Sequence, residues 1–190
     1  MPNCSTCTLT QGFQRDCESK PGGGHKQRLY LLNFCDLATG TEADFVRAYG
    51  SNVVEDITLA LGKCFYEIVA EKNLVNTTQT RNDNGSISQV VNFTLTTRAL
   101  AGTKYEAAQA ANDIVDQLIK ADGEFVAILV ERDGTAFVYG VQSGLEVTAS
   151  ERTTGSAQTD TPAFAITLTA VDSSHAPALD TTVYTITPCA

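Results

Sequence analysis

Residues 124–142 read EFVAILVERDGTAFVYGVQ, two apolar runs separated by the tetrapeptide Arg132-Asp133-Gly134-Thr135. Glycine reaches the left-handed backbone conformation that a tight turn requires, so Asp-Gly between two apolar runs predicts a β-hairpin. The sequence therefore predicts two antiparallel strands, at residues 124–131 and 136–142.

Apolar and polar residues alternate on both sides of this hairpin. In residues 86–98 Ile87, Val91, Phe93 and Leu95 point one way and Ser88, Asn92, Thr94 and Thr96 point the other, which is the period-two pattern of a half-buried strand. The same alternation occurs in residues 163–170. Other short runs of apolar, aromatic and β-branched residues predict the remaining strands, at 28–35, 52–59, 63–71, 146–149 and 183–187.

One helix is predicted, over residues 103–121. Thr103 and Glu106 form a capping box at its start, and Gly123 follows its end. Apolar residues recur at helical spacing along one face, which predicts that this face packs on a sheet. The predicted face consists of Tyr105, Ala108, Ala111, Val115, Leu118 and Ile119.

The predicted loops are polar. Residues 39–50 are expected to form a loop or a short helical turn, with Thr41 as a possible N-cap. Residues 72–85, KNLVNTTQTRNDNG, are too long for a tight turn and are predicted to be a long hairpin loop that binds a partner or is disordered alone. Residues 150–161 and 171–180 are predicted loops as well.

These elements predict a mainly β fold, an antiparallel β-sandwich or partly closed barrel with one flanking helix. Pro21-Gly22-Gly23-Gly24 separates the first residues from the body of the chain. We therefore expect a flexible N-terminal arm over residues 1–24, a single domain over residues 25–190, and an extended C-terminal arm.

The chain of 190 residues has 13 Lys and Arg against 22 Asp and Glu, a formal net charge of −9. Such an acidic protein is not expected to bind nucleic acid through a basic surface that neutralises phosphates. No apolar run approaches the length of a membrane span, and residues 1–7 do not resemble a targeting signal. The sequence thus predicts a soluble protein made in the cytoplasm.

Six cysteines stand at positions 4, 7, 17, 35, 64 and 189. The spacing of Cys4 and Cys7 could chelate zinc, with Cys17 and either His25 or Cys35 completing a tetrahedron. A second Cys-x-x-Cys or Cys-x-x-His pair is missing, so reduced thiols or disulfides formed in an oxidising environment remain the alternatives.

Catalytic motifs are missing from the sequence. Neither His25 nor His175 stands in a catalytic pattern, and no nucleophile elbow, phosphate loop or dinucleotide fingerprint is present. Glu67 and Glu71 are interpreted as part of a solvated acidic row. We expect a protein without enzymatic activity or cofactor, of the kind that gains buried surface by lying across its neighbours in a ring or stack.

The order of elements after the helix resembles that of the tail tube proteins of tailed bacteriophages. The resemblance rests on residues 125–134 (FVAILVERDG) and 137–148 (FVYGVQSGLEVT), followed by Gly155, Asp160, Phe164 to Leu168 and Ala176-Pro177. It covers roughly residues 60–180 and is a pattern of apolar, glycine and loop positions.

The resemblance implies a structural virion protein that forms hexameric rings, and that the rings stack into a hollow tube through which phage DNA passes without specific binding. The partners would be other copies of the chain and other tail proteins, such as a terminator, a baseplate or tip, and a sheath; assembly would take place in the host cytoplasm. The implied inter-subunit loop is 72–85, with Asn73, Asn76, Thr78, Arg81 and Asn84. Glu67 and Glu71 are the first candidates for acidic residues of the lumen, which would repel phosphates.

Two alternatives remain from the sequence. One is another virion protein that forms a single ring or decorates a capsid, such as a terminator or connector. The other is a monomeric cysteine-rich module that binds a ligand or zinc through residues 1–24 and 72–85.

Overall fold

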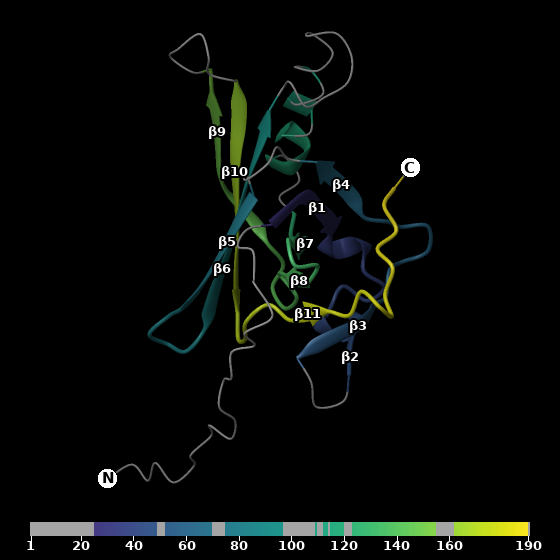
Figure 1. Cartoon of the computed structure of the whole chain (residues 1–190). Helices are drawn as coiled ribbons and strands as arrows, with labels where there is room; N and C mark the ends of the chain where they lie inside the picture. Colours follow the sequence, from purple (N-terminus) through teal and green to yellow (C-terminus); the bar gives the residue numbers. More distant parts are fainter. Residues whose placement is uncertain are drawn as a thin grey trace, which may run out of the picture.

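A computed structural model describes residues 25–48, 52–69, 75–96, 109, 112–113, 115–119, 123–154 and 162–189. These residues form a seven-stranded and a four-stranded sheet that pack face to face (Figure 1). The predicted β-sandwich class is confirmed, and the described strands close no barrel.

The seven-stranded sheet has the order β2-β3-β11-β8-β7-β1-β4. Its strands are β1 (His25–Asn33), β2 (Phe45–Arg47), β3 (Val53–Ile57), β4 (Tyr66–Val69), β7 (Phe125–Glu131), β8 (Ala136–Tyr139) and β11 (Ala178–Leu179). Neighbours are antiparallel except β11 and β3, which are parallel. Two short 3-10 helices, Phe34–Asp36 and Glu42–Asp44, connect β1 to β2.

The four-stranded sheet is antiparallel throughout, in the order β5-β6-β10-β9. Its strands are β5 (Val75–Arg81), β6 (Ile87–Thr96), β9 (Glu146–Thr153) and β10 (Ala163–Asp172). Its strands extend beyond the seven-stranded sheet, and the tip of the β5–β6 hairpin projects from the body of the molecule (Figure 1).

The hydrophobic core has two parts, one on each face of the seven-stranded sheet. The first lies between the sheets and contains Phe93 and Ile166 opposite Leu129. The second lies on the far face, where Val126 and Ile128 pack against residues from the β1–β3 connection and from the C-terminal segment. Because β7 is buried on both faces, its five consecutive residues 125–129 are all buried, whereas a strand of the four-stranded sheet alternates.

The predicted hairpin at the Asp-Gly turn is confirmed. Glu131 N–H donates to Thr135 O at 2.7 Å, and Asp133 Oδ1 accepts from Thr135 N–H at 2.8 Å. Gly134 has φ +103°, the left-handed conformation that the sequence predicted for this position.

The helix prediction is confirmed in part. The described residues 112–113 and 115–119 are helical, and Val115 and Leu118 are buried in the core between the sheets. The prediction for Ile119 is wrong, because its side chain is 50% exposed. The predicted start at Thr103 lies outside the described residues.

The prediction of a single long loop at 72–85 is wrong. Residues 75–81 form strand β5, which pairs with β6 from Val75 opposite Phe93 to Arg81 opposite Ile87. The turn needs only residues 82–86, with Gly85 at φ +89°. Threonine is β-branched and favours strands. A polar run rich in threonine therefore forms an edge strand here, although Val75 is its only buried residue.

Other strands also differ from the sequence prediction. Strand β9 continues through residues 150–153, where a loop was predicted, because these exposed residues pair with β10. Residues 183–187 form no strand, and the short strands β2 and β11 were not predicted.

The N-cap prediction for Thr41 is confirmed by a capping box with Asp44.

Two buried carboxylates brace the connection between β1 and β3. Asp44 accepts backbone N–H donors from Thr39, at 2.9 Å and 3.1 Å, and from Thr41 at 3.3 Å. Asp36 accepts from Asn33 at 2.7 Å and pairs with Lys63 at 2.7 Å. Burial alone would raise both pKa values, but the hydrogen bonds outweigh it, so the pKa of each aspartate lies below its ordinary value.

We expect acid to destabilise the protein through these groups. A carboxylate with a lowered folded-state pKa stabilises the fold above its unfolded pKa of about 3.9, and this contribution is lost as the pH falls through the folded-state value. The melting temperature should therefore decrease as the pH is lowered below about 4. Asp44→Asn should lose less stability over that pH range than the parent protein. Thermal denaturation followed by circular dichroism between acid and neutral pH checks this; an equal acid loss in both proteins would contradict it.

Candidate assembly surface

The four-stranded sheet turns one face to the core and the other away from it. On β6 the core side carries Val91 and Phe93, and on β10 it carries Ile166 and Leu168. Residues directly opposite on paired strands share a face, so the strand register identifies the other side, here called the outer face. The outer face consists of Asn76, Thr78, Thr80, Ser88, Val90, Asn92, Thr94, Glu146, Ala149, Glu151, Thr153, Ala163, Ala165, Thr167, Thr169 and Val171.

The outer face is polar and has no positive charge. Of its sixteen residues none is Lys or Arg, and Glu146 and Glu151, both exposed, lie on β9. Its apolar members are Val90, Ala149, Ala163, Ala165 and Val171. A hydrogen-bonded ladder crosses three of its strands: Thr167 Oγ1 donates to Asn92 Oδ1 at 2.8 Å, and the Asn92 amide donates to Asn76 Oδ1 at 3.0 Å. These bonds join the side chains of Asn76, Asn92 and Thr167 within the sheet.

Both edges of this sheet are long strands with one partner each. Within the described residues β5 pairs only with β6, and β9 only with β10. Asn82 N–H donates to Ser86 O, so the backbone of Asn82 faces β6, and by alternation the N–H groups of Gln79 and Arg81 face away from it. Edge strands of this kind are templates for pairing with another chain.

A buried polar junction holds the sheet in place behind the outer face. Gln89 is 1% exposed; its amide donates to Asp172 Oδ2 at 3.1 Å and to Ser174 O at 3.2 Å, and its Oε1 accepts from Gly140 N–H at 3.1 Å. Asp172 also accepts from Ser143. The junction therefore connects β6 and β10 to the turn after β8.

Gln89→Leu is expected to lower the free energy of unfolding by about 2–3 kcal/mol. Leucine fills a similar volume but leaves Gly140 N–H and Ser174 O without their buried partner. Chemical denaturation measures the difference. Gln117→Leu, at an exposed position on the helix, is the control and should stay within about 0.5 kcal/mol of the parent; equal values for the two variants would contradict this role.

The structure brings four of the five predicted loop residues together on the β5–β6 hairpin. Asn76, Thr78 and Arg81 are exposed on β5, and Asn84 lies in the turn, where its Oδ1 accepts from Ser86 N–H at 3.0 Å. Asn73 lies outside the described residues.

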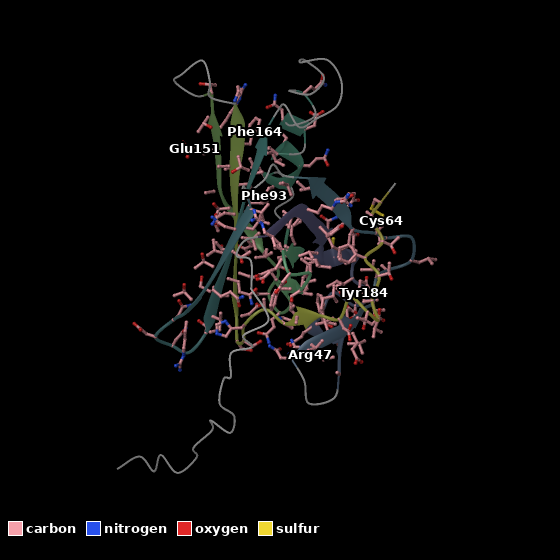
Figure 2. The ribbon with its side chains drawn as sticks, viewed as in Figure 1. Arg47, Cys64, Phe93, Glu151, Phe164 and Tyr184 are labelled. Atoms are coloured by element: carbon pink, nitrogen blue, oxygen red, sulfur yellow. A yellow bond between two sulfur atoms is a disulfide. The ribbon has the colours of Figure 1, made fainter. Side chains whose placement is uncertain are left out.

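The two acidic candidates lie elsewhere. Glu67 is on β4, in the seven-stranded sheet, and pairs with Arg28 at 2.9 Å. Glu71 lies outside the described residues. Two carboxylates on the outer face, Glu146 and Glu151, were not among the candidates. Glu151 fell in the predicted loop, and Glu146 stood in a predicted strand whose neighbours in the sheet were unknown; Figure 2 shows Glu151 on β9.

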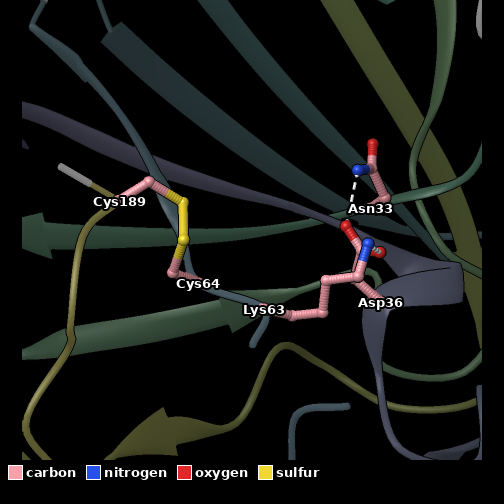
Figure 3. The surroundings of a disulfide bond; sticks show 5 residues. All are labelled: Asn33, Asp36, Lys63, Cys64 and Cys189. Carbon is pink, nitrogen blue, oxygen red and sulfur yellow. Dashed lines mark hydrogen bonds and ion pairs between the residues drawn. A yellow bond between two sulfur atoms is a disulfide. The ribbon is translucent and has the colours of Figure 1, made fainter. Parts of the chain in front are cut away.

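The cysteines have different environments. Cys64 and Cys189 form a disulfide (Figure 3). Cys35 is free and exposed. The zinc candidates Cys4, Cys7 and Cys17 lie outside the described residues. Among the residues described, no group of three or more His, Cys, Asp or Glu side chains could hold a metal ion.

No helix in the described part of the chain is long and apolar enough to cross a membrane. The chain matches no family model, no curated protein and no solved structure.

Proposed function

We propose that this protein is a structural subunit whose four-stranded sheets join edge to edge in a closed ring, and that stacked rings form a phage tail tube. The observation that carries the proposal is the four-stranded sheet itself, which combines two long edge strands with a polar outer face free of positive charge. The resemblance of residues 60–180 to tail tube proteins supports the identity of the tube.

The direction of the strands suits a ring. All neighbours in the sheet are antiparallel and the strand number is even, so β9 and β5 run in opposite directions. When one copy places β9 beside β5 of the next, the joint is antiparallel as well, and the alternation continues unbroken. Such a head-to-tail contact makes a ring if the rotation between copies closes.

The size of such a ring suits a channel. Six copies, the number that the resemblance implies, would contribute about 24 strands. With strands about 4.8 Å apart and tilted by about 40°, the barrel would be about 48 Å across between backbones. Barrels of about 16–18 strands already enclose an aqueous channel, so this lumen would be open.

The charge of the outer face suits the passage of DNA. If this face lines the lumen, phosphates meet threonine, serine and asparagine side chains and the carboxylates of Glu146 and Glu151. A surface without Lys or Arg does not neutralise phosphates or release the counterions condensed on the DNA, so DNA would slide without binding. In this proposal Glu146 and Glu151 take the role that the sequence suggested for Glu67 and Glu71.

Sedimentation velocity over a range of concentrations tests the proposal. We expect a species of about six chain masses, or larger stacks, to replace the monomer as concentration rises. A species that stops at one ring would favour a terminator-like protein over a tube. A monomer at every concentration would contradict assembly.

A further inference from the structure

The last residues of the chain are tied to the edge of the seven-stranded sheet by a disulfide. Cys189 bonds to Cys64, 125 residues earlier in the chain, just before β4 (Figure 3). Residues 183–189, here called the C-terminal strap, run along this edge. Figure 2 shows Cys64 and Tyr184 on the side of the molecule away from Glu151 and the four-stranded sheet.

Few non-covalent contacts hold the strap. Phe65 N–H donates to Thr187 O at 3.3 Å, and Cys189 N–H donates to Phe65 O at 2.7 Å. At the start of the strap the N–H groups of Val183 and Tyr184 donate to Asp180 O, at 3.3 Å and 2.9 Å, within a local turn. Tyr184 and Ile186 are half-buried against the far part of the core, but Val183 is 66% exposed. Ordering seven residues costs conformational entropy at every one of them, and these contacts are few against that cost.

The core between the two sheets does not include the strap and contains no residue beyond Ala176, whereas Tyr184 and Ile186 of the strap pack only on the far part of the core. Cys64 is held from the other side, because its neighbour Lys63 pairs with Asp36 at 2.7 Å, and Asp36 is in turn bonded to Asn33 (Figure 3). The anchor for the strap therefore stays in place whether or not the strap is attached.

We propose that the Cys64–Cys189 disulfide is a redox-operated latch that closes the C-terminal strap over Phe65, the residue before β4. With the bond formed, the strap covers the backbone N–H and C=O of Phe65 and the side chains beneath Tyr184 and Ile186. With both cysteines as thiols, the strap detaches and leaves these backbone groups of Phe65 without their partners on the strap.

The latch closes by two thiol–disulfide exchanges with a small disulfide such as oxidised glutathione. The Cys189 thiolate attacks the glutathione disulfide, which forms a mixed disulfide and releases one glutathione thiol. The Cys64 thiolate then attacks the Cys189 sulfur and releases the second. Two protein thiols are oxidised and one glutathione disulfide is reduced; an excess of dithiothreitol reverses the reaction.

Hydrogen exchange followed by mass spectrometry tests the latch on the full chain, oxidised and reduced with dithiothreitol, and on Cys189→Ser. In the reduced protein and the variant, we expect the amides of Phe65 and the strap to exchange about tenfold faster or more. Strands β6 and β10 should remain far better protected than the strap. Cys35→Ser removes the exposed free thiol and should behave like the parent under both conditions.

Two results would overturn the proposal. If the strap keeps its protection after reduction, the contacts alone hold it. If β6 and β10 lose protection together with the strap, the disulfide is a structural element of the whole fold. Neither result depends on assembly, because the strap lies on the seven-stranded sheet. The latch can therefore be contradicted without contradicting the proposed ring, and the ring without the latch.

Discussion

Gly140→Ala is expected to lower the free energy of unfolding by about 3–5 kcal/mol, the largest effect of any single methyl group considered. Gly140 has φ +75°, a conformation that L side chains rarely adopt. A Cβ there would lie 2.8 Å from Phe125 O and 2.9 Å from Leu145 N, two backbone atoms that are bonded to each other at 2.7 Å. Because backbone atoms cannot swing aside, the bridge between Phe125 and Leu145 must open or shift.

Gly62→Ala is the matched control for this variant. Gly62 has φ +79°, but no atom lies within 4 Å of a Cβ built on it, so alanine there meets the conformational penalty without the clash. We expect about 1–2 kcal/mol for the control. Chemical denaturation of both variants measures the difference, and equal losses would contradict the close approach at Gly140.

Proline at the edge strand β9 is expected to abolish ring formation. Successive backbone N–H groups of a strand point to opposite sides, so one of Ser150 and Glu151 donates toward β10 and the other points to the open edge. Proline removes the N–H group, and its ring obstructs a strand that pairs there. Both side chains are exposed, so neither Ser150→Pro nor Glu151→Pro creates a cavity.

The two proline variants control each other. The variant at the outward N–H should keep the secondary structure and a melting temperature close to the parent's, and yet remain a monomer. The variant at the inward N–H should lose a bond to β10 and melt lower as well. Circular dichroism and sedimentation velocity make the comparison; if both variants form rings like the parent's, β9 is not the joint.

Elements whose residues carry their own signal could be predicted from the sequence. The β7–β8 hairpin follows from Asp133-Gly134 between apolar runs, and β6 and β10 follow from alternation on a half-buried sheet. Gly140 and Gly144 stand in the stretch 137–148 on which the resemblance rests. The structure supplies a physical reason for Gly144, because a Cβ there would overlap Glu124 Cβ.

Elements that depend on distant partners could not be predicted. Strand β5 and the end of β9 are polar, so no apolar alternation marks them, and their pairing with β6 and β10 holds them extended. Conversely, residues 183–187 have strand-forming residues but no full strand partner among the described residues. The bond between Cys64 and Cys189 joins positions 125 residues apart, and connectivity among six cysteines cannot be deduced from spacing.

The place of four candidate residues could be predicted, but their role between subunits stays a prediction. Asn76, Thr78, Arg81 and Asn84 were chosen on a long hairpin loop, and the structure places them on the β5–β6 hairpin. Glu67 was chosen because it precedes that hairpin in the sequence, but proximity in sequence does not place residues on the same sheet. Gln89 follows the apolar alternation of β6 as its one polar member, which was the available signal for a buried polar junction.

Electron cryomicroscopy of the concentrated protein tests the central claim most directly, because it shows which edges meet. We predict hollow rings or rods in which β9 of each copy pairs antiparallel with β5 of the next and the outer face lines the lumen. Particles that remain single subunits, or an assembly whose interfaces leave both strands unpaired, would contradict the account.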